Sequence, residues 1–102
     1  MNTFIADRNK ILEKLEEIID PELGVDIVNL GLVYSIEIDE SNITILMTMT
    51  TPSCPMHTYL TQQTAESVRR LYPWMYINVK LIWDPPWNPE MMSDKAKKMF
   101  GR

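Results

Sequence analysis

Residues 34–50 read YSIEIDESNITILMTMT and predict a β-hairpin. In the first half, apolar residues alternate with Ser35 and Glu37, and in the second half they alternate mainly with threonines. A period of two is typical of strands that bury one face and expose the other. The polar run from Asp39 to Asn42 lies between the halves and favours a turn. We therefore expect two neighbouring strands, at residues 34–38 and 43–50, joined by a tight turn.

The segments on either side of the hairpin predict helices. Before it, apolar residues recur at helical spacing as far as Ile19, and the helix must stop by Asp20 because Pro21 disfavours helical backbone in the preceding residue. After it, the alternation ends, and the apolar spacing from Pro55 to about Leu71 suits a second helix. Proline is favoured in the first turn of a helix, which agrees with a start near Pro55.

The last third of the chain predicts one more strand and a short helix. Residues 77–83 alternate again, whereas residues 84–89 contain three prolines and are expected to be irregular. Ser93 has the side chain of a helix N-cap, and Gly101 marks the end of that helix. The order α-β-β-α-β-α predicts a two-layer α+β domain over residues 1–102, with a small three-stranded mixed sheet packed by helices.

The composition excludes several classes of partner. Fourteen acidic and ten basic residues give a net charge of −4, and the basic residues are dispersed, which argues against nucleic-acid binding. No apolar run approaches the length that spans a membrane, and residues 1–10 lack the apolar centre of a signal peptide. We therefore expect a cytoplasmic protein that binds neither membrane nor nucleic acid. A single cysteine excludes an internal disulfide.

That cysteine, Cys54, is the strongest candidate for chemistry. It lies in Pro52-Ser53-Cys54-Pro55, at the predicted start of the second helix. The unpaired amides and the positive end of the helix dipole favour an anion there, and hence the thiolate that attacks electrophiles and binds metals. Free cysteines are also often small buried hydrophobic residues, but the position between two prolines favours a functional role.

His57 follows Cys54 by three residues, so the two side chains can share a helix face. Such a pair could activate the thiol or supply two ligands to a soft metal, although a surface histidine explains His57 as well. Asp20 and Glu22 flank Pro21 at a predicted helix end, where negative charge is unfavourable. That placement indicates either a site or a capped turn.

Two further groups of residues have open interpretations. The hydroxyls that lead into the thiol could hydrogen-bond a thiolate or an anion, or could simply be strand residues on a solvated face; they are Thr48, Thr50, Thr51 and Ser53. Trp83 and Trp87 lie in a proline-rich loop that either covers one end of the core or docks a partner through its aromatic rings.

Three segments together resemble a known family: residues 20–34 (DPELGVDIVNLGLVY), 49–55 (MTTPSCP) and 83–93 (WDPPWNPEMMS). The chain resembles the SufT/PaaD-like family of small metal–sulfur cluster biosynthetic proteins, which is related to a subunit of the cytosolic iron–sulfur targeting complex. The resemblance implies a compact assembly-type domain that helps to mature iron–sulfur proteins. It also implies a reactive cysteine at Cys54, an acidic pair at Asp20 and Glu22, and functional threonines at Thr50 and Thr51. His57 departs from the family pattern, so no ligand role is inherited there.

We therefore expect an iron–sulfur assembly factor that carries or delivers clusters, or helps to mature apoproteins, rather than a turnover enzyme. Iron–sulfur centres ordinarily take four cysteine ligands, so a cluster or iron bound at Cys54 would be transient and shared between chains. The sharing chain would be a second copy in a homodimer, a component of the assembly machinery, or an apoprotein. Nearby carboxylates raise the pKa of a thiol and the helix end lowers it, so the net direction for Cys54 stays open.

Two alternatives remain. One is an adaptor that docks apoproteins through the aromatic, proline-rich loop, with Cys54 in a structural role. The other is a small thiol enzyme, with Cys54 as the nucleophile and His57 as the base.

Overall fold

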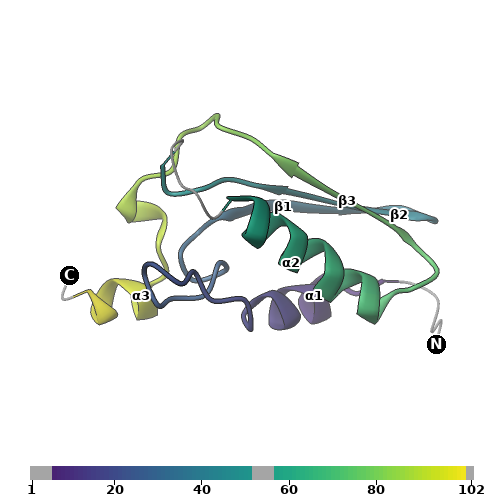
Figure 1. Ribbon diagram of the computed structural model, residues 1–102, viewed down its shortest axis with the longest axis horizontal. Coiled ribbons are helices and arrows are strands. Elements are labelled where there is room, and N and C mark those ends of the chain that lie inside the picture. Colours follow the sequence, from purple (N-terminus) through teal and green to yellow (C-terminus); the bar gives the residue numbers. More distant parts are fainter. Residues whose placement is uncertain (1–5, 52–56, 101–102) are drawn as a thin grey trace.

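Three strands form a sheet that has helices on one face, as the computed structural model shows (Figure 1). The structure describes residues 6–51 and 57–100, so Cys54 and its immediate neighbours lie outside the described residues. The predicted α+β class and the order α-β-β-α-β-α are confirmed. The elements, in chain order, are α1 (Arg8–Leu15), β1 (Val33–Ile38), β2 (Asn42–Met47), α2 (His57–Leu71), β3 (Tyr76–Leu81), the 3-10 turn η1 (Pro89–Met91) and α3 (Asp94–Met99).

The sheet has the order β1-β2-β3 and is mixed, as predicted. β1 and β2 form the expected antiparallel hairpin, and β3 pairs with β2 in parallel after the α2 crossover. Asp39 closes the hairpin turn, because its Oδ1 accepts hydrogen bonds from the amides of Ser41 (2.9 Å) and Asn42 (2.7 Å). These backbone donors hold the pKa of Asp39 below its usual value. The turn therefore rests on an ionised carboxylate.

The core lies between the sheet and the helices α1 and α2, which share one face of the sheet (Figure 1). β2 supplies its centre, because alternate residues of this middle strand are fully buried. The fully buried side chains that meet there are Ile43, Ile45 and Met47 from β2, Ile11 and Leu15 from α1, and Leu60 and Val68 from α2. None of the described helices is long and apolar enough to cross a membrane.

Several predicted boundaries were wrong by a few residues. α1 ends at Leu15 rather than near Asp20, because the amide of Ile18 bonds back only three residues, to the Leu15 carbonyl (3.0 Å). Ile18 is nevertheless buried, so a loop residue continued the apolar spacing of the helix. β2 ends at Met47 and β3 at Leu81, where the parallel pairing of the two strands stops.

The C-terminal segment is largely as predicted. Ser93 is the N-cap of α3, and its Oγ accepts a hydrogen bond from the amide of Ala96 (3.2 Å). The proline-rich segment was expected to be irregular throughout, but its last residue, Pro89, starts the turn η1. Asn88 caps that turn, since its Oδ1 accepts a hydrogen bond from the amide of Glu90 (2.9 Å).

Candidate functional site

The loop before β1 and the segment after β3 pack against each other, although some sixty residues separate them in the chain. Trp87 Nε1 donates a hydrogen bond to the Leu30 carbonyl (2.7 Å), and the Ser93 amide donates to the Asn29 carbonyl (2.8 Å). These contacts bring together two of the three segments that carry the family resemblance, at the left of the view and next to α3 (Figure 1).

A chain of polar side chains fastens α3 to this loop. The Asp26 carboxylate accepts hydrogen bonds from the amides of Val28 (3.1 Å) and Asn29 (3.0 Å), and from Asn29 Nδ2 (2.7 Å). Asn29 is thereby oriented so that its Oδ1 accepts a hydrogen bond from Ser93 Oγ (2.6 Å). The same Ser93 Oγ caps α3. Asp26 and Asn29 therefore have a structural role here.

Gly31 allows the two segments to approach closely. Its φ is +82°, and a Cβ built at this position would collide with the Met91 carbonyl oxygen. Any other residue at position 31 would therefore push the Met91 turn away from the loop.

Asp20 holds a turn together. Its side chain is buried, with 2% exposed, and its Oδ1 accepts hydrogen bonds from the amides of Glu22 (2.8 Å) and Leu23 (3.3 Å). Its carbonyl accepts another from Gly24 (2.8 Å). Because α1 ends five residues earlier, Asp20 does not face the negative end of that helix, and the capped turn accounts for its position. Glu22, on the same turn, is exposed.

The described residues that flank Cys54 lie at one end of the sheet. Thr50 is half-buried and Thr51 is exposed, beyond the end of β2. His57 is half-buried and is the first described residue of α2, with its carbonyl accepting a hydrogen bond from Thr61 Oγ1 (2.8 Å). No group of three His, Asp or Glu side chains suited to a metal comes together in residues 6–51 and 57–100. The predicted roles of Cys54 and His57 stay predictions.

Tyr34 makes contacts with the segment after β3 that the sequence pattern did not indicate. Its hydroxyl donates a hydrogen bond to the Pro85 carbonyl (2.8 Å) and lies 3.4 Å from Met91 Sδ. Burial raises the pKa of Tyr34, and the nearby Thr48 hydroxyl opposes that shift. Thr48 itself is fully buried, and its Oγ1 makes no hydrogen bond of good geometry. The pairing of β1 with β2 shifts register between Val33 and Ser35, so the strand is irregular at Tyr34.

The two tryptophans of the proline-rich loop have different roles. Trp87 is half-buried, packs against the core and bonds to the Leu30 carbonyl, so it covers one end of the core. Trp83 is 40% exposed and is available to a partner. Each tryptophan thus fits one of the two interpretations that the sequence left open.

An apolar hollow of about 290 Å³ lies beside the turn that Asp20 holds. It is lined by Leu23, Trp87, Pro89, Met92 and Phe100. Leu23 and Phe100 are themselves partly exposed, at 37% and 41%. The hollow therefore offers a second apolar contact surface besides Trp83.

These features define a small α+β scaffold with one cysteine, carried in the segment between a sheet strand and a crossover helix. The chain belongs to the iron–sulfur cluster assembly protein family, whose sequence model matches residues 8–81. The resemblance to SufT-like proteins is thereby confirmed.

Two named relatives match most of the chain. The Fe–S protein maturation auxiliary factor YitW of Bacillus subtilis is 40% identical over 97 residues, which is 94% of this chain and 95% of the relative. The Fe–S protein maturation auxiliary factor SufT of Staphylococcus aureus is 41% identical over 85 residues, 82% of this chain and 97% of the relative.

Solved structures agree on the fold. A domain of unknown function from Bacillus anthracis is 46% identical and superposes with a TM-score of 0.85, covering 91% of this chain and 90% of its own. A conserved hypothetical protein from Thermotoga maritima is 40% identical, with a TM-score of 0.83 and full coverage of both chains.

Proposed function

We propose that this protein is an accessory factor in the maturation of iron–sulfur proteins, and that it carries or delivers a cluster through Cys54. The observation that carries the proposal is the near full-length similarity, at about 40% identity, to two proteins named as Fe–S protein maturation auxiliary factors. Its partners would be the assembly machinery and apoproteins in the cytoplasm.

The scaffold supports a single-thiol role. α2 spans His57–Leu71, so the amides of its first turn follow directly, in the sequence, on the segment that contains Cys54. Those amides and the helix dipole favour the thiolate. With one cysteine in the chain, the remaining ligands of a four-cysteine cluster have to come from other chains.

Delivery by such a thiol is a ligand exchange. The Cys54 thiolate donates an electron pair to iron. A thiol of the recipient loses its proton to solvent, and the resulting thiolate forms a new bond to iron as the bond to Cys54 breaks and releases Cys54 as a thiolate. No electron is transferred, so no oxidant or reductant is required. The cluster is cargo, and Cys54 is one temporary ligand of it.

Anaerobic reconstitution with iron and sulfide tests this proposal. The native chain and Cys54→Ser are compared for visible absorbance in the presence of a recipient apoprotein, and for activation of that apoprotein. We expect Cys54→Ser to lose both signals, while Thr58→Ala, an exposed change on the same helix, keeps them. Equal delivery by the native chain and Cys54→Ser would overturn the carrier role.

The exposed Trp83 and the apolar hollow beside Leu23 favour an adaptor as the second candidate function. In that case Cys54→Ser would still bind the apoprotein, whereas Trp83→Ala or Leu23→Ser would lose binding. A pull-down of the purified apoprotein by each variant separates the two functions.

A further inference from the structure

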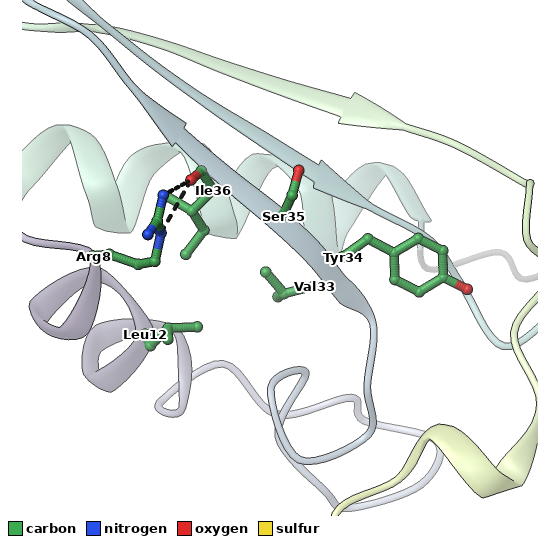
Figure 2. Close-up of a pocket in the computed structure, with 6 residues that line it drawn as sticks. All are labelled: Arg8, Leu12, Val33, Tyr34, Ser35 and Ile36. Carbon is green, nitrogen blue, oxygen red and sulfur yellow. Dashed lines mark hydrogen bonds between the residues drawn. The ribbon is translucent and has the colours of Figure 1, made fainter.

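Arg8 covers one of the two outer edges of the sheet, the edge of β1. In the β1–β2 register Ile36 lies opposite Ile45, and the Ile36 carbonyl turns away from β2. Arg8 covers that carbonyl with two hydrogen bonds, from Nε (3.2 Å) and Nη2 (2.7 Å). Figure 2 shows the guanidinium next to the Ile36 carbonyl at this edge, above Leu12 in this view. With the register shift next to Tyr34, the edge of β1 is poorly suited to pair with another strand.

The opposite edge, β3, is open. Its pairing with β2 is regular from Tyr76 to Leu81, with no register shift and no proline. The amide of Tyr76 donates to the Ser41 carbonyl and the amide of Ile82 to the Met47 carbonyl, both at 2.8 Å. Alternate residues of a strand turn their backbone groups to opposite sides.

The backbone groups of Ile77, Val79 and Leu81 therefore point away from β2. No hydrogen bond from any described residue reaches them. Their side chains are only half-buried, on the face that packs against the helices. A further strand at this edge would pair these backbone groups and cover the exposed part of these apolar side chains.

We propose that β3 pairs in antiparallel fashion with β3 of a second copy of this chain, about a two-fold axis at Val79. In this register Val79 lies opposite Val79 of the partner subunit, and Ile77 lies opposite Leu81 of the partner subunit. All three outward-facing residues then exchange both of their backbone hydrogen bonds. The two three-stranded sheets become one continuous six-stranded sheet.

The side chains of β3 are complementary to themselves in this register. On the helix side, apolar residues lie opposite apolar residues. On the other side, Asn78 lies opposite Lys80 of the partner subunit. Lys80 is the one charged residue of the strand, and a lysine at an edge normally discourages pairing, but here no like charge lies directly opposite it.

The dimer has a consequence for cluster binding, and this consequence rests on the proposed function. Thr51 and His57, which bracket Cys54, lie beyond the end of the sheet marked by Leu81. The two-fold axis separates Leu81 from Leu81 of the partner subunit by four residues along the strand, about 13 Å, and directs the two ends apart. The ligands that complete a cluster would then come from another protein rather than from the second copy.

Sedimentation equilibrium over a concentration series tests the pairing. We expect a reversible dimer, and Val79→Pro should abolish it, because this proline blocks the outward amide without removing a bond to β2. Hydrogen exchange gives a second readout. The amides of Ile77, Val79 and Leu81 should become protected as the concentration rises, whereas those of Asn78 and Lys80 should be protected throughout.

A matched pair of exposed substitutions keeps the test valid if Val79→Pro unfolds. Asn78→Lys places like charges opposite each other twice and should weaken dimerisation about 2- to 30-fold, whereas Asn78→Glu should strengthen it by a similar factor. Glu37→Gln, an exposed change on β1 with the same charge difference as Asn78→Lys, should have no effect.

A monomer at every concentration would overturn the pairing, as would a dimer indifferent to both changes at Asn78. Cluster delivery by a monomer would leave the proposed function intact.

Discussion

Removal of the Asn29 side chain should detach α3 from the loop before β1. Asn29→Ala deletes two hydrogen bonds, the one that Nδ2 donates to the Asp26 carboxylate (2.7 Å) and the one that Oδ1 accepts from Ser93 Oγ (2.6 Å). A bond to a charged group contributes about 1.5–3 kcal/mol and a neutral one about 1 kcal/mol. Because Asp26 keeps its two backbone donors and water can reach the half-buried site, we expect a loss of about 2–3 kcal/mol.

Urea denaturation followed by circular dichroism measures this loss. Asn9→Ala is the matched control, since Asn9 is exposed on α1 and should change the free energy of unfolding by less than about 0.5 kcal/mol. Ser93→Ala should also destabilise the protein. Because both changes remove the same bond, the double variant should lose about 1 kcal/mol less than the sum of the single losses. If Asn29→Ala loses no more free energy of unfolding than Asn9→Ala, or if the losses of Asn29→Ala and Ser93→Ala are additive, then Asn29 does not link α3 to the loop.

Three further predictions concern other sites. Gly31→Ala should lower the free energy of unfolding, measured in thermal melts, by about 1–3 kcal/mol. The loss should exceed that of Gly24→Ala, because both glycines have positive φ but only Gly31 faces a backbone oxygen. Equal losses for the two variants would contradict this. The lowered pKa of Asp39 means that its contribution to stability is complete above about pH 4 and is lost as the pH falls through the folded-state value. Asp39→Asn should therefore reduce the acid dependence of unfolding, and an unchanged pH profile would contradict the predicted role. His57→Ala should leave the pH midpoint of iodoacetamide labelling at Cys54 unchanged; a shifted midpoint would instead favour the thiol enzyme.

The secondary structure followed closely from the sequence where local chemistry decides it. The hairpin, the Asp39 turn and the Ser93 cap were found where predicted, although β2 ends at Met47 rather than at Thr50. The end of α1 was not, because Ile18 is buried by packing of a loop rather than by continuation of the helix. A buried residue in a loop can continue the apolar spacing of a helix, so the spacing does not show where the helix ends.

The candidate site was predicted less completely, because its contacts join distant segments. Asp20 looked unfavourable at a helix end, but the helix stops earlier and the carboxylate caps a turn. Asn29 and Ser93 stand 64 positions apart, and nothing in either segment indicates that they bond. The family resemblance named the segments that matter without indicating which of them touch.

The amino-acid sequence by itself determined the element order, the hairpin, the single thiol and the family, because periodicity, turn chemistry and motif identity are local properties. Only the tertiary structure decided which tryptophan covers the core, what Asp20 does, and which sheet edge is open. The role of Asp20 depends on the early end of α1. The other two depend on a partner far away in the chain, which is Leu30 for Trp87 and Arg8 for the edge of β1. A hydrogen bond across such a separation leaves no periodic trace in either segment.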